Sequence, residues 1–303
     1  MPKIAYIEKR FQGKSLDLIA TANRIIEEYA AQGFDLTLRQ LYYQMVSRDI
    51  IPNTMKSYKR LGNVIDDARL AGLIDWSRIV DRTRNVQANA HFDDPSDIMR
   101  AALNSFKVDK WKGQACRVEV WIEKDALAGV IDGICRRLDV PFFATRGYNS
   151  QSEQWRAGRR LRRYLDQGQI PVIFHLGDHD PSGIDMTRDI VDRLQLFMGG
   201  TKVDRLALNF DQVEQYNPPP NPAKMTDSRA EAYVAEFGRS SWELDALEPA
   251  VIVGLIESAV DRFRDPDPWE ERVKVEEEGR RLLRLAATNW NEVTDFLEGE
   301  IGE

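Results

Sequence analysis

Residues 170–183 read IPVIFHLGDHDPSG, an apolar run that leads into a polar turn containing glycine and proline. An apolar run of this length, bounded by turn residues, is typical of a strand buried on both faces. Residues 184–197 then place apolar side chains at helical spacing. The stretch therefore predicts a strand, a tight turn and a helix, the order found at the start of a repeating α/β unit.

The same alternation extends to both sides of this stretch. Further strands are expected at residues 117–123, 141–145 and 203–209, and further helices at residues 126–138 and 152–166. Strands that alternate with helices pair in parallel through crossover connections. We therefore expect an α/β domain with a mainly parallel sheet over residues 116–216.

Acidic residues stand at two of the predicted strand ends. Glu123 closes the first strand, and Asp178 and Asp180 lie in the turn after residues 170–176. The carboxyl ends of parallel strands gather at one edge of the sheet, and carboxylate oxygens are ligands that Mg²⁺ prefers. The sequence predicts a magnesium site formed by these three residues. The alternative for the turn is that Asp180 or Ser182 only caps the following helix.

Other potential ligands are weaker candidates. Glu119 lies inside its strand, and His175 is expected to be buried. His179 could touch a phosphate or a metal, but a histidine facing solvent from the turn is the preferred interpretation. The two cysteines, Cys116 and Cys135, have no CxxC spacing, so we expect reduced, buried thiols and no zinc site.

The acidic motifs carry a family resemblance. A strand that ends in Glu, followed by a hydrophobic strand that ends in Asp-x-Asp, resembles the Toprim domain of topoisomerases, primases and related nucleases. The DxDPxG form at residues 178–183 is most similar to the A-type, tyrosine-bearing subunit of topoisomerase VI, a type IIB topoisomerase, and to its meiotic relatives. Residues 144–147 (ATRG) resemble a TR-containing segment of the same protein, which makes Arg146 a candidate DNA contact.

Residues 1–90 predict a separate helical domain. Apolar periodicity indicates helices at residues 15–32, 38–48 and 55–71, with Thr37 as the cap of the second. Three helices joined by a short turn suggest a helix-turn-helix, and residues 73–84 alternate enough to form the β-wing of a winged helix. Cations on the third helix and the wing are candidate DNA contacts, although a solvated helix face would look similar. They are Lys56, Lys59, Arg60, Arg82 and Arg84.

The second of these helices carries two adjacent tyrosines. Tyr42 falls on an apolar stripe with Leu38 and Met45, so it is expected to be structural. Tyr43 shares the other, exposed face with Arg39, one turn earlier. An arginine there could hold a phosphate and favour phenolate character, whereas the alternative is a surface tyrosine packed on an arginine stem. The pattern resembles the R-x-x-[F/Y]-Y catalytic motif of the tyrosine-bearing topoisomerase VI chain.

The resemblance covers roughly residues 37–210, with both modules in the order found in that family. It implies a CAP-like winged-helix domain at 1–90, a connector at 91–115, a Rossmann-like Toprim domain at 116–216 and a helical C-terminal extension at 217–303. That extension does not align with the family. The chain is shorter than the topoisomerase VI chain and contains no ATPase domain, so it resembles the compact members called Topo mini-A.

The resemblance also implies an activity and partners. Tyr43 would attack a DNA phosphate that Arg39 orients, while Glu123, Asp178 and Asp180 hold Mg²⁺. Double-stranded DNA is the implied substrate. A homodimer is implied in which tyrosine and metal site come from opposite protomers, and a GHKL-type ATPase would be a separate partner protein. Two alternatives remain open: a Toprim metallonuclease that uses activated water, and a DNA-binding protein without catalysis.

Composition agrees with a folded protein that acts on DNA through part of its surface. Of 303 residues, 43% are hydrophobic and 30% charged, as in soluble globular proteins of two domains. Residues 1–90 carry a net charge of +4 in a chain of net charge −7. The sequence has no secretory apolar segment and no run of about 18 apolar residues. We therefore expect a cytoplasmic protein that does not enter membranes.

Overall fold

A computed structural model describes residues 3–80, 91–145, 147 and 151–301. The chain forms two compact units. The first combines Met1–Arg84 with Val118–Val260, and the second combines Asn85–Arg117 with Asp261–Glu303.

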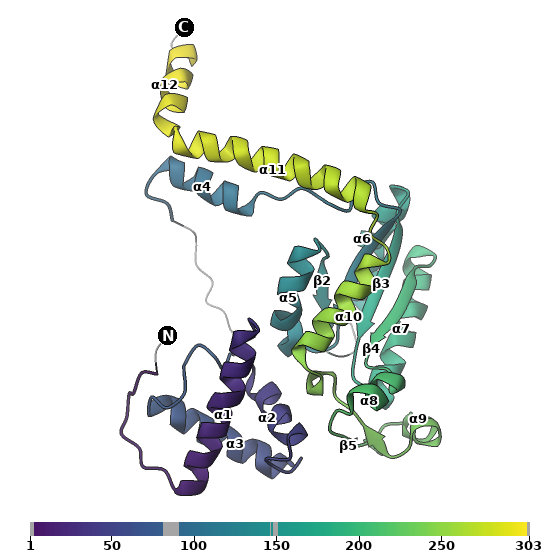
Figure 1. Cartoon of the computed structure of the whole chain (residues 1–303). Coiled ribbons are helices and arrows are strands. Elements are labelled where there is room, and N and C mark those ends of the chain that lie inside the picture. Colours follow the sequence, from purple (N-terminus) through teal and green to yellow (C-terminus); the bar gives the residue numbers. More distant parts are fainter. Residues whose placement is uncertain (1–2, 81–90, 146, 148–150, 302–303) are drawn as a thin grey trace. The chain divides into compact units, whose positions relative to one another are not determined.

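The sheet of the first unit confirms the α/β class. Four parallel strands lie in the order β2-β1-β3-β4, as Figure 1 shows. They are β1 (Cys116–Ile122), β2 (Phe142–Ala144), β3 (Ile170–Leu176) and β4 (Lys202–Ala207). The chain leaves β1 on one side toward β2 and then crosses to β3 on the other side. The direction of winding therefore reverses between β1 and β3, and such a switch point opens a crevice at the carboxyl ends of the strands.

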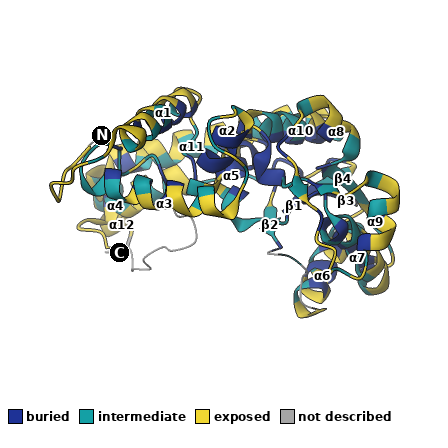
Figure 2. Cartoon of the chain, turned by 90° about the horizontal axis from the view of Figure 1, so that it is seen from below, coloured by how far each residue is buried: buried dark blue, intermediate teal, exposed yellow. Residues whose placement is uncertain are grey.

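Helices cover both faces of this sheet. On one face α6 (Gln151–Asp166) and α7 (Pro181–Met198) bury Leu161 and Leu194 against Trp121 and Ile173. Figures 1 and 2 show α5 (Ala128–Arg137), preceded by a 3-10 turn at Asp125–Leu127, and α10 (Pro249–Asp261) on the opposite face. These helices and strands confirm the predicted alternation, and most begin and end within three residues of the predicted bounds.

The N-terminal helices have their own core. α1 (Gly13–Ala31), α2 (Leu38–Ser47) and α3 (Met55–Leu70) pack around Ile25, Leu41 and Ile65, all of which are buried. Thr37 caps α2 as predicted, and Gln40 completes a capping box with it. The predicted β-wing is not seen over residues 73–80, which form turns with one bridge between Leu36 and Ile79. The rest of that segment, including Arg82 and Arg84, lies outside the described residues.

A segment after the sheet was not predicted in detail. It contains α8 (Phe210–Tyr216), α9 (Ala230–Phe237) and a 3-10 turn at Leu244–Ala246. Two very short strands, β5 (Asn221–Pro222) and β6 (Ser240–Ser241), pair within it. Pro-rich sequence around residue 220 suggested only a break, because two-residue strands leave no periodic pattern.

The second unit is helical, and it contains the predicted connector and only the last part of the predicted extension, because residues 217–260 belong to the first unit. It consists of α4 (Pro95–Ser105), α11 (Pro266–Thr288) and α12 (Trp290–Ile301). Glu276 of α11 is buried and accepts hydrogen bonds from Lys110 Nζ at 2.6 Å and the Val108 amide at 3.0 Å. Burial alone raises the pKa of Glu276, but these hydrogen bonds outweigh it and hold the pKa at about 2.

Among the described residues, no helix is both long and apolar enough to cross a membrane.

Candidate functional site

The two predicted acidic strand ends meet at the switch point. Glu123 follows β1 directly, and its amide donates to the Leu176 carbonyl at 2.8 Å. Its carboxylate accepts the Asp178 amide at 2.9 Å. Gly177 leaves room for this contact, since a Cβ there would lie 3.0 Å from the Glu123 carboxylate. The structure therefore brings Glu123 and Asp178 together at one edge, as the sequence predicted.

Asp180 has a structural role in the same turn. It caps α7, and its carboxylate accepts the Gly183 amide at 2.6 Å. Gly183 is required by close packing, because a Cβ at that position would lie 2.1 Å from the Asp178 carbonyl oxygen. The helix-capping interpretation therefore holds for Asp180. The residue also lines the pocket described below, so capping does not remove it from the candidate site.

Arg205 on β4 fixes the shape of this turn. Its guanidinium donates to the carbonyl oxygens of Asp178 at 2.6 Å and Gly183 at 2.8 Å. Burial lowers the pKa of Arg205 to about 10, which still leaves it charged at neutral pH. Sequence patterns did not single out this residue, because it lies within an ordinary strand.

Lys124 is the principal site residue that sequence reasoning missed. Its ammonium lies 3.0 Å from Asp178 and 3.0 Å from Asp245, and it also pairs with Glu243. Burial alone lowers the pKa of Lys124, but these three carboxylates outweigh it and raise the pKa. The pKa of Asp178 is raised to about 7, because burial and the neighbouring acids outweigh the attraction of Lys124. The edge therefore concentrates negative charge around one cation.

Arg39 of α2 joins this acidic cluster. Its guanidinium pairs with Glu243 and lies 3.1 Å from Asp245, the two acids that also bind Lys124. It also lies 5.8 Å from the centre of the Tyr43 ring. The predicted neighbourhood of Arg39 and Tyr43 on α2 is therefore present. The acids that connect them to the strand ends are more than 200 residues from Arg39 in the sequence, which is why no local motif indicated them.

The expected exposure of Tyr43 is wrong. Tyr43 is only 4% exposed, because the segment around β5 covers this face of α2. Asn221 of β5 donates a hydrogen bond to the Tyr43 hydroxyl at 3.3 Å. Tyr42 is buried and donates to the Asn53 side chain at 2.9 Å, as expected for a structural residue.

The surroundings of Tyr43 also change the expected electrostatics. Burial raises the pKa of its hydroxyl, and Glu243 and Asp245 raise it further. Asn221 and Arg39 act in the opposite direction but do not outweigh them. Phenolate character is therefore disfavoured in this arrangement, whereas the sequence alone suggested that Arg39 would promote it.

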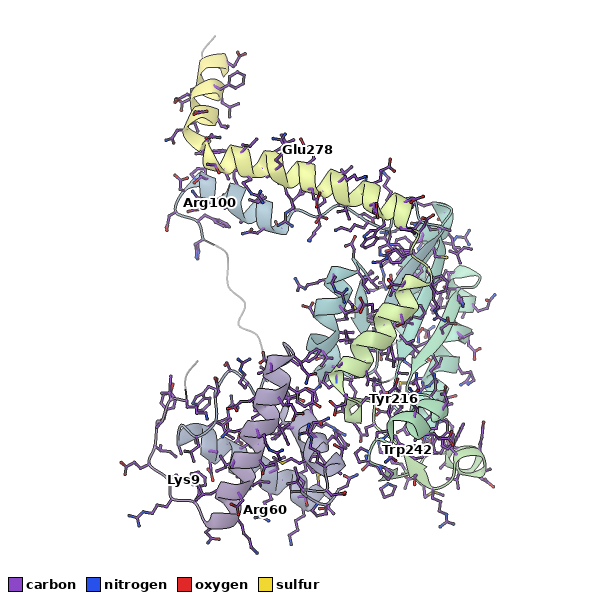
Figure 3. All side chains as sticks on the ribbon, viewed as in Figure 1. Lys9, Arg60, Arg100, Tyr216, Trp242 and Glu278 are labelled. Carbon is purple, nitrogen blue, oxygen red and sulfur yellow. The ribbon has the colours of Figure 1, made fainter. Side chains whose placement is uncertain are left out.

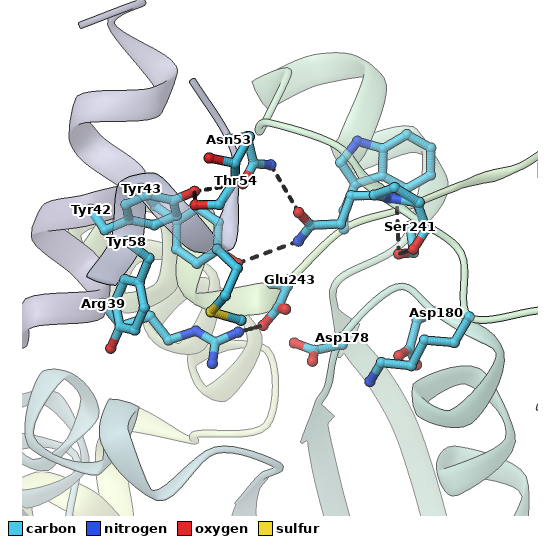
Figure 4. Close-up of a pocket in the computed structure, with 15 residues that line it drawn as sticks. Arg39, Tyr42, Tyr43, Asn53, Thr54, Tyr58, Asp178, Asp180, Ser241 and Glu243 are labelled. Atoms are coloured by element: carbon cyan, nitrogen blue, oxygen red, sulfur yellow. Dashed lines mark hydrogen bonds and ion pairs between the residues drawn. The ribbon is translucent and has the colours of Figure 1, made fainter. Parts of the chain in front are cut away.

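One pocket brings most of the predicted residues together. It has a volume of about 330 Å³ and is lined by Arg39, Tyr43, Asp178 and Asp180, with Glu243 between them (Figure 4). A pocket of this size is at the lower end of the range for small-molecule sites and suits a single nucleotide unit. All these residues belong to one chain, whereas the family resemblance implies that tyrosine and acids come from opposite protomers.

The donor set at this edge fits a hard divalent cation. Glu123, Asp178 and Asp180 offer only oxygen ligands, and the pKa of Asp178 is raised by burial and by neighbouring negative charge that such a cation would offset. Over the described ranges, no three acidic, histidine or cysteine side chains already converge closely enough to hold an ion. The chemistry of the donors thus agrees with Mg²⁺, while their present positions are set by protein hydrogen bonds.

The basic residues predicted on α3 form an accessible surface. Lys56, Lys59 and Arg60 are all accessible to solvent, and Figure 3 labels Arg60 on the outside of these helices. Pocket residues Thr54 and Met55 precede them at the start of the same helix. The three cations therefore lie on the helix that begins at the pocket. The other three candidate DNA contacts, Arg82, Arg84 and Arg146, lie outside the described residues.

The expected solvent exposure of His179 is also wrong. It is buried, not solvent-facing, and its Nδ1 lies 2.8 Å from the Tyr233 hydroxyl. Phe237 and Trp242 pack against its ring, and both come from the segment whose fold was not predicted. Burial lowers its pKa to about 4, so the imidazole is neutral at physiological pH.

The three remaining weaker candidates make contacts within the protein. His175 is buried, as expected, and its Nδ1 lies 2.8 Å from the Thr187 hydroxyl. Glu119 accepts two hydrogen bonds from Arg160, at 2.9 and 2.8 Å. Cys135 is buried and forms no disulfide. None of these three residues lines the pocket.

No protein-family model matches this sequence, and the curated proteins provide no match to it either.

Proposed function

We propose that this chain is a compact DNA-cleaving enzyme of the type IIB topoisomerase kind, built from a winged-helix domain and a Toprim domain like the tyrosine-bearing chain of topoisomerase VI. The observation that carries this proposal is the shared pocket, in which Arg39 and Tyr43 of α2 face Asp178 and Asp180 (Figure 4). Two motifs that are 135 residues apart in the sequence, at Tyr43 and Asp178, thus line one cavity.

In the proposed reaction, the Tyr43 oxygen attacks the phosphorus of a DNA phosphodiester. A bond forms between this oxygen and phosphorus, and the bond between phosphorus and the 3′ oxygen breaks. The phenolic proton is lost to solvent and the leaving 3′ oxygen takes up a proton, which leaves a 3′ hydroxyl and a 5′-phosphotyrosyl end. Such covalent catalysis conserves the phosphodiester energy for rejoining.

Arg39 and Asn221 position the reacting groups. The Arg39 guanidinium has five N–H donors, and binding two carboxylates leaves donors for a phosphate oxygen. Asn221 holds the Tyr43 oxygen by a hydrogen bond, which opposes part of the rise that burial causes in the pKa of the hydroxyl. Because Glu243 and Asp245 are ion-paired with Arg39, they restrict where its guanidinium can reach.

Glu123, Asp178 and Asp180 would hold Mg²⁺, which when bound stabilises negative charge on the phosphate. Lys56, Lys59 and Arg60 would contact the backbone of double-stranded DNA along α3. Cutting both strands requires two active sites, which favours a homodimer, and strand passage would require a separate GHKL-type ATPase protein. The proposed location is the cytoplasm.

Supercoiled plasmid incubated with the protein and Mg²⁺ tests this proposal. Denaturation with detergent should release DNA with protein attached to its 5′ ends. Tyr43→Phe should abolish these attached ends, whereas Tyr42→Phe, a matched loss of one buried tyrosine hydroxyl, should retain them. Equal adduct yields from both variants would contradict the assignment of Tyr43.

A metal-dependent nuclease is the second candidate, and one observation favours it. Tyr43 is buried and the pKa of its hydroxyl is raised, both of which make it a weaker nucleophile. A water molecule activated at the edge of the sheet that carries Glu123, Asp178 and Asp180, which we call the carboxylate edge, would then cut the DNA backbone. This candidate predicts free ends without attached protein and full cleavage by Tyr43→Phe. Binding of DNA without either kind of cut would instead indicate a non-catalytic protein.

A further inference from the structure

The outer face of α6 is unusually rich in arginine for a chain of net charge −7. Five of the eight residues from 156 to 163 are arginines. Arg160 is partly exposed, and its guanidinium pairs with the buried Glu119. The other four, Arg156, Arg159, Arg162 and Arg163, are exposed. The exposed part of α6 is visible in Figure 2, and we call these four residues the α6 arginine face.

Two of the four charges of this face have no ion-pair partner among the described residues. Within the described ranges, Arg159 and Arg163 form no ion pair. Arg156 pairs with Glu153, and Arg162 with Asp166 at 3.1 Å, but both partners lie on α6 itself. Exposed pairs of this kind contribute little free energy, so a multivalent anion can displace the carboxylates. Arginine is also the side chain best suited to phosphate, because its planar fork binds two oxygens.

We infer that the α6 arginine face binds the phosphate backbone of DNA, as a second contact surface besides α3. Arg156 and Arg163 are seven residues apart, which is about 10 Å along a helix axis. That length corresponds to about three phosphates on one strand of B-DNA. The arginines can therefore follow one strand. This inference rests on the proposed action on DNA, and it assigns a further surface of the chain over which the duplex would lie.

The direction of α6 shows which end of this face lies nearest the carboxylate edge. Gln154 contacts Asp189 in the middle of α7, and Arg162 contacts the Met198 carbonyl at its end. α6 therefore runs alongside α7 in the same sense, and α7 begins at the turn that contains Asp178 and Asp180. The first turns of α6 lie nearest that edge. Trp155, which is 52% exposed, stands there and offers a flat ring to a sugar or an unpaired base.

A membrane surface fits α6 less well than DNA does. An interfacial helix needs a free apolar face, but the apolar face of α6 is buried in the sheet domain through Ala157 and Leu161. Trp155 is the only exposed large hydrophobic side chain on the described helix. The partner that matches the observed chemistry is therefore a polyanion with regularly spaced phosphates.

Binding of a fluorescent 30-base-pair duplex without Mg²⁺ tests the inference, with anisotropy measured over a range of salt concentrations. Arg159→Ala/Arg163→Ala should raise Kd on the order of tenfold at 0.1 M salt and reduce the salt slope by about 2, one for each phosphate that is no longer neutralised. The control is Arg136→Ala/Arg284→Ala, which removes two exposed arginines elsewhere and gives the same net charge. It should bind like the wild type, and both variants should keep the wild-type Tm.

The binding measurements test the inference, and the adduct measurements test the proposed function separately. Equal Kd values and slopes for the two double variants would overturn it, as would a wild-type protein that does not bind the duplex. Binding to anionic vesicles that depends on Arg159 and Arg163, without such dependence for DNA, would also overturn it. Saturating DNA should restore Tyr43 adducts in Arg159→Ala/Arg163→Ala. Absence of adducts in the wild type, with the binding defect intact, would contradict the proposed chemistry alone.

Discussion

Replacing Lys124 by methionine tests whether one cation holds the carboxylate edge together. Methionine keeps most of the apolar stem and removes the ammonium. Asp178, Glu243 and Asp245 then lose their shared partner, while Arg39 remains on the last two. The variant should remain folded but be markedly less stable at pH 7.

The magnitude follows from burial. The Lys124 side chain is 17% exposed, and those of Asp178 and Asp245 are 11% and 1% exposed. Breaking a buried ion pair by removing one partner costs about 3–5 kcal/mol. The Asp178 carboxyl, whose pKa is already raised to about 7, can relieve part of this cost by taking up a proton. We therefore expect a decrease of about 3 kcal/mol in the free energy of unfolding.

Urea denaturation at pH 7 measures this decrease, and a second substitution controls for its cause. Asp245→Asn in the Lys124→Met background should recover roughly half of the stability, because it removes one uncompensated charge. The decrease should also shrink at pH 5, because the Asp178 carboxyl, whose pKa is about 7, is then mostly protonated and no longer pairs with the Lys124 charge. A decrease below about 1 kcal/mol, or no recovery on adding Asp245→Asn, would refute the role given to Lys124.

Three further predictions concern other parts of the chain. Glu276→Gln should cost on the order of 2 kcal/mol at pH 7. Because the folded pKa of Glu276 is lowered from 4.5 to about 2, this difference in urea denaturation should disappear as the pH falls through that interval; a constant difference would contradict it. Asn221→Ala removes a hydrogen bond that acts to lower the pKa of Tyr43, so the pH profile of adduct formation should move upward, and an unmoved profile would count against this contact. Gly183→Ala places a Cβ against the Asp178 carbonyl and should cost about 2–3 kcal/mol, seen as a lower Tm; a wild-type Tm would show that the turn is not constrained.

Much of the fold could be predicted because its signals are local. The strand at residues 170–176 was predicted with its observed bounds, since a buried apolar run between turn residues has few alternatives. Thr37 could be predicted as a helix cap from its residue type and position. The contact between Glu123 and Asp178 could be predicted because the ends of parallel strands meet at one edge of a sheet. The β-wing was predicted from weak alternation, and residues 73–80 instead form turns, with Ile74 and Ile79 both buried.

The rest of the site could not be predicted because it depends on contacts between distant segments. Asn221 and Glu243 reach the pocket through two-residue strands and short turns, which have no periodicity to detect. Asn221 covers Tyr43, and Tyr233, Phe237 and Trp242 of the same segment cover His179. Both residues were therefore expected to be exposed, whereas they are buried. Lys124 is adjacent to a predicted ligand, but its role depends on acids more than 50 residues away in the sequence.

The proposed reaction joins Tyr43 covalently to DNA. Trypsin cuts after Arg39 and Arg48, so both tyrosines of α2 lie in one nine-residue peptide, QLYYQMVSR. After cleavage of DNA in the presence of Mg²⁺, nuclease digestion and trypsin, fragmentation of this peptide by mass spectrometry locates the added nucleotide. We predict a nucleotide on Tyr43 and none on Tyr42. Cleaved DNA together with an unmodified peptide, or a nucleotide on another residue, would contradict the proposed mechanism.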